Sequence, residues 1–516
     1  MIKNVLDRPR GSPFSFSLFG PWTVAAVWAS ARLAFPPAAH NSHTIMYPLV
    51  DAAGGYNSLE PFHPLYVPMV RVLRGAWEAG GRLTPALPVM QAVSLLAACA
   101  HLLLLATVVR RATGRRDLAL GAVLIASATQ NLWAWGTMTT SYTLATACLL
   151  AAAARALSIE RPTLRDAWAV GAWLGLAAGW DTAAAAGLLA FGWDLMRRRA
   201  PGDSSTRLWA ALIGGFLIPV AFAYALFFRR LGALGWPVHA TFASVQASLP
   251  PDIQPLWQTL DFRGQWRAWQ QSTAPLDAPL WAALATLALS QVGGKDDEKR
   301  ARLWRLGAGL WLAISAFFFI SDPHNRFVYA AGILLPALAA AAFSRARRPL
   351  LGCSLLAAAL LAWNCLHPPL YAPESNPGLD EAEFLVARLA PGGLILAASD
   401  PDWILSYGLG RRVEVVSLSR PGDDFRSFGH RRMPVDTLET QREVDALLCG
   451  VFRRGGRAVF AADAMFRSSL LPSRTLDQDV NRFFAGLSRR FAVGPDWISP
   501  GGQHYEPLSA RRGSCR

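Results

Sequence analysis

The residues best suited to chemistry follow the first apolar segment, in a polar stretch between positions 40 and 74. Asp51 and Glu60 are the only carboxylates of this stretch. A carboxylate can take the proton from an attacking hydroxyl, and cationic or hydrogen-bonding groups can hold a departing phosphate as its charge develops. The pattern predicts a transfer reaction with Asp51 as general base and Glu60 as the other candidate. The side chains that can supply a cation or a donor are Arg32, His63, Arg71 and Arg74.

Each of these residues also has a simpler interpretation that the sequence leaves open. Asp51 precedes a pair of glycines and fits an ordinary solvated turn. Glu60 stands before a proline, as in many exposed connections, and His63 can cap the helix that follows.

Two further groups of ionisable residues are expected at turns between apolar segments. One is the turn from Ser321 to Arg326, which contains Asp322 and His324. Ionisable groups at a membrane edge are functional candidates. Arg326 alone has a simpler explanation, because a long arginine side chain at a helix end can extend to the polar surface of the membrane. Asp181 occupies a similar turn.

Metal chemistry is not favoured by the spacing of the candidate ligands. Six of the nine histidines fall in predicted outer loops or at the outer ends of apolar segments, but no pair has ligand spacing on one helix. We therefore expect no cofactor and no resident metal. Cys449 and Cys515 lie in the C-terminal tail and can pair in an oxidising compartment.

The elements that must position these residues are predicted to be membrane-spanning helices. The chain is 53% apolar and only 16% charged, which fits a membrane protein better than a soluble one. Apolar runs close to the length of a spanning helix predict about eleven spans, near 17–36, 86–109, 118–136, 140–158, 165–180, 182–197, 207–228, 276–293, 303–320, 327–344 and 349–366.

Basic clusters set the expected orientation, because Lys and Arg near span ends stay on the cytoplasmic side. They lie at 1–10, 110–116, 197–207, 295–305 and 345–348, which requires residues 37–85 to remain outside as one external loop. The apolar stretch 63–80 carries three charges, each costing about 2.5–3.5 kcal/mol at mid-bilayer. It is predicted to be an interfacial helix. The N-terminus is then cytoplasmic and the tail extracytoplasmic.

The tail, residues 371–516, is predicted to be a soluble α/β domain that follows the multi-span domain, residues 1–370. Strands are expected at 394–398, 413–418 and 458–461, and helices at 379–390, 402–409 and 438–448. Residues 491–493 and 505–508 are expected to form an edge hairpin. The net charge of +15 mostly follows the orientation bias, so no nucleic-acid partner is expected.

Several short motifs resemble the GT-C superfamily of polyprenyl-phosphate-sugar glycosyltransferases, nearest the bacterial protein O-mannosyltransferase-like branch. They are Arg32 late in the first span, Asp51 in the first loop, His63-Pro-Leu-Tyr66, Trp133–Tyr142, Gly175–Asp181 and Asp322–Arg326. The resemblance implies that Asp51 is the catalytic base and that outer-face arginines contact lipid phosphate. It also makes Tyr66 a candidate for substrate binding. Ser141 stands where the family has a glutamate.

The function expected from the resemblance is transfer of a sugar from a polyprenyl phosphate to an extracytoplasmic protein, lipid or polysaccharide. The expected location is a bacterial inner membrane, with membrane lipid as a partner. Two alternatives remain: a non-catalytic assembly or scaffold protein, and a transporter or flippase. A transporter would show repeated halves with polar residues at mid-membrane, and no repeat is evident.

Overall fold

A computed structural model of the 516-residue chain gives the fold. It describes residues 20–34, 63–78, 86–129, 132–133, 136, 141–200, 204–231, 298–321, 332–366, 377–389, 392–397, 409, 413–419, 431–434, 438–461 and 474–515.

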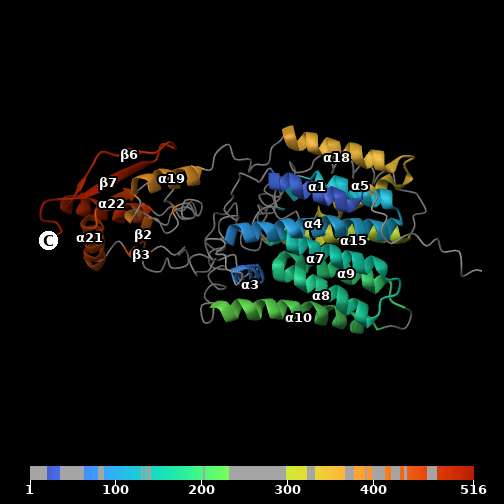
Figure 1. The fold of residues 1–516 in the computed structure, drawn as a ribbon. Coiled ribbons are helices and arrows are strands. Elements are labelled where there is room, and N and C mark those ends of the chain that lie inside the picture. The colour runs from blue at the N-terminus through green and yellow to red at the C-terminus, as the bar shows by residue number, and fades with distance from the viewer. Residues whose placement is uncertain are drawn as a thin grey trace, which may run out of the picture.

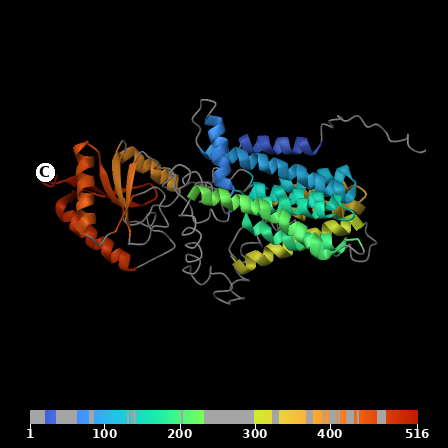
Figure 2. The same ribbon diagram turned by 90° about the horizontal axis from the view of Figure 1, so that it is seen from below.

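The described residues between 20 and 366 form helices, most of which lie side by side, as Figures 1 and 2 both show. Every predicted span except 276–293, which lies outside the described residues, overlaps at least one helix, although the span 327–344 corresponds to three short helical elements. The helices are α1 (Pro21–Ala34), α3 (Tyr66–Glu78), α4 (Ala86–Thr113), α5 (Arg116–Ser127), α7 (Tyr142–Ser158), α8 (Leu164–Trp180), η2 (Thr182–Ala186), α9 (Gly187–Arg197), α10 (Ser205–Leu231), α15 (Glu298–Ser321), η4 (Gly332–Leu334), α17 (Leu335–Ala342), η5 (Phe343–Arg345) and α18 (Pro349–Leu366).

Two of the described helices are long and apolar enough to cross a membrane by length and composition. They contain Val89–Thr113 and Ser205–Arg229. Shorter apolar helices accompany them at Tyr142–Ser158, Gly332–Arg345 and Pro349–Asn364.

Helix α5 is shorter than the predicted span 118–136. The N–H groups of Ala128 and Thr129 donate to carbonyls three residues back, at Ile125 and Ala126. The Thr129 hydroxyl also donates to the Ala126 carbonyl, at 2.8 Å. Bonds of this spacing tighten the last turn of a helix and satisfy its terminal carbonyls. The helix therefore ends at Ser127, just before the polar residues Thr129, Gln130 and Asn131.

Helices α8 and α10 pack backbone against backbone through glycines. A Cβ added to Gly171 or Gly175 of α8 would lie 2.0 or 2.2 Å from a carbonyl oxygen of α10, and one added to Gly215 of α10 would lie 2.2 Å from the Trp168 carbonyl. Small residues four apart allow this close approach between membrane helices.

Three arginines from three elements bind carbonyls at or just past the C-terminal end of α7. Arg111 donates to the Ala154 carbonyl, Arg302 donates to Ala156 at 2.5 Å, and Arg198 donates to Ile159. Arg115 and Arg300 both bind Ser344, at 2.8 and 2.7 Å. The basic clusters at 110–116, 197–207, 295–305 and 345–348 therefore share one end of the bundle.

The described residues from 377 onward form a mixed sheet flanked by helices, at the red end of Figure 1. The strand order is β3-β2-β1-β4-β7-β5, with β6 beside β7. Pairs among β1 to β4 are parallel and pairs with β7 are antiparallel. The elements are α19 (Pro377–Leu389), β1 (Gly393–Ala397), β2 (Val413–Ser419), β3 (Arg431–Pro434), α21 (Leu438–Arg453), β4 (Ala458–Ala461), α22 (Arg474–Arg490), β5 (Phe491–Val493), β6 (Trp497–Ile498) and β7 (His504–Ala510).

Strand β1 shows why helices cover both faces of this sheet. Its side chains alternate between the faces, and all five residues are buried. Leu394 and Leu396 pack in one cluster with α21 and α22, whereas Ile395 and Ala397 pack in another with α19. Burial on both faces is typical of parallel strands. The predicted hairpin pairs as expected, but β7 lies inside the sheet between β4 and β5.

Candidate functional site

The second half of the predicted first external loop contains a helix that crosses the bundle. Helix α3 appears nearly end-on in Figure 1 and lengthwise in Figure 2, where α4 lies across it. Tyr66, Val67 and Val70 are buried together with Met90 of α4, while Val72 on the other side is 71% exposed. The expected helix is thus present with one packed face. Tyr66, a predicted substrate contact, lies in this packed face.

His63 fastens the start of this segment to two other helices. Its Nδ1 lies 2.8 Å from the Trp180 carbonyl at the end of α8 and 2.9 Å from the Ser141 hydroxyl oxygen, just before α7. The ring also meets the Tyr142 ring edge to face, with centroids 5.3 Å apart. His63 is only 5% exposed, so it anchors residues 63–66 from within the protein.

The hydrogen bond of His63 fixes which ring nitrogen carries the proton. A carbonyl oxygen only accepts, so Nδ1 must donate to Trp180, and the Ser141 oxygen shares the same hydrogen. In the neutral ring, Nε2 is then the acceptor nitrogen. Ser141 holds the N-cap position of α7 without making a capping bond.

The main chain next to His63 completes the docking. The Leu65 N–H donates to the Gly179 carbonyl at 3.1 Å. A Cβ on Gly179 would lie 2.7 Å from Leu65 Cδ1, so a larger residue there would force the Leu65 side chain to shift. Gly179 continues the row of Gly171 and Gly175, and the same ridge that packs against α10 therefore receives the docked segment.

Asp181 follows immediately after the carbonyl that binds His63. Its Oδ1 accepts from the Ala183 N–H at 3.0 Å and so caps η2. The side chain is 5% exposed. Burial raises the pKa of this carboxyl from 3.8 to about 7, and the Ala183 hydrogen bond opposes the rise. Asp181 can therefore hold or release a proton near neutral pH.

Arg32 is held at the end of α1 by an aromatic face. Its guanidinium carbon lies 4.8 Å from the centroid of a Trp133 ring, and the residue is 8% exposed. Trp133 donates from Nε1 to the Ser127 carbonyl at 2.5 Å and meets Trp28 edge to face. A guanidinium stacked on an indole keeps its planar fork of donors, which suits a phosphate or carboxylate.

The predicted site residues divide into three groups. Trp180 connects His63 and Asp181, because its carbonyl binds His63 and Asp181 is the next residue. Arg32 contacts Trp133 and His63 contacts Ser141, and both partners belong to the segment between α5 and α7. Arg71 and Arg74 are partly buried on α3. The remaining predicted residues lie outside the described part of the chain: Asp51, Glu60, Asp322, His324 and Arg326.

Two contacts were not expected from the sequence. Ser141 was noted only as a difference from the family pattern, and a serine just before a helix indicates a cap rather than a histidine partner. His101 of α4 is buried and its Nδ1 lies 3.2 Å from Thr146 Oγ1 of α7. The Thr146 hydroxyl donates to the Thr143 carbonyl, so His101 is the donor in this pair.

Among the residues that the structure describes, no group of three or more His, Cys, Asp or Glu side chains is placed to hold a metal ion. The expectation of no resident metal remains a prediction.

The long helices, with a short helix docked across one end, have the fold of the GT-C glycosyltransferases, as the sequence motifs predicted. The O-mannosyltransferase-like branch remains a prediction. The sequence matches no protein-family model and no curated protein sequence.

Among solved structures, the chain is similar to ArnT from Cupriavidus metallidurans. In the apo state the TM-score is 0.55 at 14% identity, covering 96% of this chain and 98% of ArnT. In the structure bound to undecaprenyl phosphate the TM-score is 0.54 at 13% identity, with the same coverage. The oligosaccharyltransferase of Archaeoglobus fulgidus gives a TM-score of 0.45 at 12% identity, over 94% of this chain and 73% of that one.

Proposed function

We propose that this protein is an integral-membrane glycosyltransferase that moves a sugar from a polyprenyl-phosphate donor to an extracytoplasmic acceptor. The observation that carries the proposal is the similarity over 96% of the chain to ArnT, whose crystal structure holds undecaprenyl phosphate. Both proteins would then need the same two capacities: a cationic group for the lipid phosphate and a base for the acceptor hydroxyl.

In this proposal the base is Asp51, with Glu60 as the second candidate. The carboxylate takes the proton of the acceptor hydroxyl while oxygen attacks the anomeric carbon, and the lipid phosphate leaves with the bonding electrons. The docking of His63 to Trp180 supports this role, because it fixes the position of the chain three residues after Glu60.

Arg32 is the proposed phosphate contact among the described residues. Its charge lies against Trp133 at the end of α1, next to the loop that carries Asp51 in the sequence. A bidentate guanidinium can neutralise the charge that develops on the leaving phosphate. Arg71, Arg74, His324 and Arg326 are further proposed contacts, and Asp181, Asp322 and Tyr66 are proposed to line the substrate site.

The proposed orientation places the arginine-rich end of the bundle in the cytoplasm and the His63 end outside. Helix α7 has 17 residues, so at 1.5 Å per residue its ends lie about 25 Å apart. His63 contacts the first end and the three arginines contact the other. This separation supports a bundle whose two ends lie at opposite faces of a membrane. The proposal keeps about eleven spans across a bacterial inner membrane, with the C-terminal part as a soluble extracytoplasmic α/β domain.

The Cys449–Cys515 disulfide supports an extracytoplasmic C-terminal domain, because disulfides persist mainly in oxidising compartments. The acceptor class is a protein, lipid or polysaccharide, and the proposed mechanism requires no metal. The O-mannosyltransferase-like branch is the proposed relationship within the superfamily.

The proposal is tested by sugar transfer with purified protein in lipid nanodiscs, a pool of labelled polyprenyl-phosphate sugars, and an acceptor pool of extracytoplasmic protein, lipid and polysaccharide. We predict transfer by the wild type and a loss of about a hundredfold or more for Asp51→Asn, since Asn keeps the shape and removes the base. Glu60→Gln is the matched control and should retain most of the activity.

Two results would change the assignment. If Glu60→Gln loses about a hundredfold in activity while Asp51→Asn keeps its activity, the base is Glu60 and not Asp51. If folded wild type transfers no sugar from any donor of the pool, the glycosyltransferase proposal fails, and donor flipping and partner capture become the measurements that separate a transporter from a scaffold.

A further inference from the structure

A cavity of about 290 Å³ opens where α22, α21 and the end of β7 meet. It is lined mainly by basic side chains. The lining residues are Asp445, Arg489, Arg490, Phe491, Arg511, Arg512 and Ser514. Four arginines and one carboxylate give this lining a net charge of +3. A cavity of this size is slightly smaller than typical drug-sized ligand sites and suits a single headgroup.

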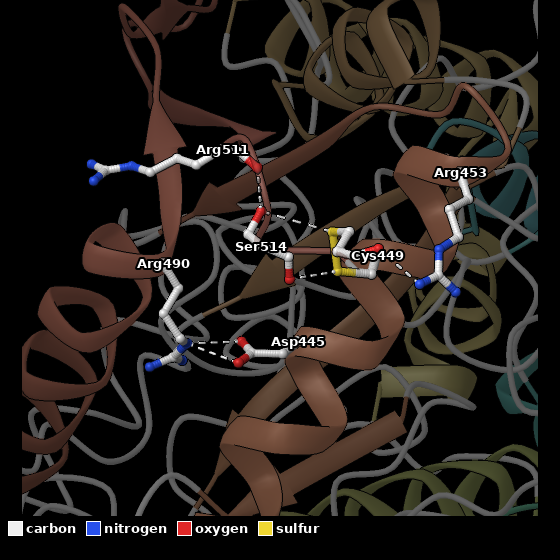
Figure 3. The surroundings of a disulfide bond; sticks show 7 residues. Asp445, Cys449, Arg453, Arg490, Arg511 and Ser514 are labelled. Carbon is white, nitrogen blue, oxygen red and sulfur yellow. Dashed lines mark hydrogen bonds and ion pairs between the residues drawn. A yellow bond between two sulfur atoms is a disulfide. The ribbon is translucent and has the colours of Figure 1, made fainter.

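Only one of the four arginines is paired with the carboxylate. Arg490 Nε lies 2.8 Å from Asp445 Oδ2, and Figure 3 shows the two side chains turned toward each other. The Nη2 atom of Arg490 is buried and has no hydrogen-bond partner among the residues that the structure describes. A buried donor of this kind is costly to leave without a partner, and Arg490 is one of the residues that line the cavity.

The end of helix α22 explains part of this cluster. Arg489 and Arg490 lie in the last turn of α22, where the helix dipole favours cations. Arg511 donates from Nη2 to the Ser488 carbonyl at 3.0 Å, using one of its five N–H donors. The helix end accounts for neither Arg512 nor the buried Nη2 atom of Arg490.

The C-terminal segment is held in place so that its arginines line the same cavity as the arginines of α22. The Cys449–Cys515 disulfide joins this segment to α21, and Arg453 donates to the Cys515 carbonyl at 2.8 Å. Figure 3 shows Arg511 and Ser514 on the segment and Asp445 on α21 beside this bond. The cluster is therefore assembled without a ligand, which reduces the entropy cost of binding one.

We propose that this cavity binds the phosphate or pyrophosphate group of a ligand. An excess of three positive charges calls for a multiply charged anion, and guanidinium forks match the oxygens of a phosphate. The site lies in a different part of the chain from the proposed catalytic residues, so it goes beyond the transferase activity. Its ligand is either a phosphorylated membrane lipid or a soluble phosphate compound.

The test is calorimetric titration of the full-length protein, in nanodiscs of phosphatidylcholine, with inorganic pyrophosphate. The variant is Arg511→Gln/Arg512→Gln, and the matched control is Arg454→Gln/Arg457→Gln. The control removes the same two charges from exposed positions of the same sheet unit that do not line the cavity. Non-reducing thiol labelling checks that the Cys449–Cys515 bond is retained in each variant.

We expect one pyrophosphate per wild-type protein and an affinity about tenfold or more lower in the cavity variant, because charge-assisted hydrogen bonds are lost. The control should stay within about twofold of the wild type. No binding by the wild type, or equal weakening in both variants, would overturn the proposal.

A second set of discs, containing phosphatidic acid as well as phosphatidylcholine, identifies the source of the phosphate. If a lipid headgroup reaches the cavity, the wild type binds pyrophosphate more weakly in these discs. An unchanged affinity assigns the site to a soluble phosphate compound.

Discussion

At the scale of single residues, the candidate site depends on polar groups that are held inside the protein. His63 donates to a main-chain carbonyl, and Asp181, the residue after that carbonyl, caps η2. Asp181 carries no ion pair among the described contacts, so burial raises its pKa to about 7. Such a shift makes the charge of the site depend on pH.

Asp181→Asn is predicted to change how stability depends on pH. The folded-state pKa of about 7 lies above the ordinary value of 3.8, so the folded state keeps a proton that the unfolded state has released. Stability therefore falls as the pH rises from about 4 to about 7. Asn cannot ionise but can still accept from the Ala183 N–H, so the variant loses this dependence.

The measurement is the melting temperature of wild type and Asp181→Asn at pH 5 and pH 8. The Tm of the variant minus the Tm of the wild type should be larger at pH 8 than at pH 5 by roughly 2 °C or more, given the usual relation between free energy and Tm. Glu160→Gln, which changes an exposed carboxylate, controls for the loss of one acidic group. An identical Tm difference at both pH values would contradict the role of burial at Asp181.

At the scale of elements, a row of glycines joins the packing of the bundle to the docking of the site. Gly171 and Gly175 of α8 let α10 approach, and Gly179 receives Leu65. Displacing α8 would therefore move Trp180, whose carbonyl holds His63. The packing of α8 against α10 therefore affects the position of the carbonyl that binds His63.

Adjacent glycines of α10 give a matched test of this packing. A Cβ at Gly215 would lie 2.2 Å from the Trp168 carbonyl, whereas a Cβ at Gly214 meets nothing within 4 Å. We predict that Gly215→Ala lowers the free energy of unfolding by about 1–3 kcal/mol through overpacking. Gly214→Ala should be neutral or stabilising, because Ala favours helix by about 1 kcal/mol over Gly.

Thermal unfolding in one detergent compares the two variants directly. Equal melting temperatures for Gly215→Ala and Gly214→Ala would show that α8 and α10 do not pack as closely as the structure has them.

The sequence predicted the helices well where apolar runs are long, because length and hydropathy alone set them. The early end of α5 was missed, because the predicted span ran through the short polar interruption at residues 129–131 to the apolar residues that follow it. Helix α22 and strand β3 were also missed. Their sequences are largely polar, and in the part of α22 whose burial is described, residues 482–490, the buried residues are Phe483 and Leu487.

The candidate site was predictable only in part. Arg32, His63 and Asp181 were recognised by residue type and by their place near the ends of apolar runs. Their contacts were not, because the partners of His63 are 78 residues away at Ser141 and 117 away at Trp180. No local pattern predicts contacts across such distances. The roles of Asp51, Glu60 and the turn at 322–326 remain predictions.

At the scale of the whole molecule, the two ends of the bundle differ in chemistry. One end gathers the arginines that bind the terminal carbonyls of α7, and there Arg198 also pairs with the buried Asp194. The other end holds His63, Asp181 and the crossing helix α3. The central claim is that a lipid phosphate is handled at the His63 end.

Photo-crosslinking tests this claim most directly. A polyprenyl phosphate with a photoreactive group close to the phosphate is bound to the full-length protein in nanodiscs, and the labelled peptides are mapped by mass spectrometry. We predict labels in residues 63–78 and 132–142, with excess undecaprenyl phosphate competing them away. Labels confined to residues 300–305 and 344–348, at the arginine end, would contradict the account.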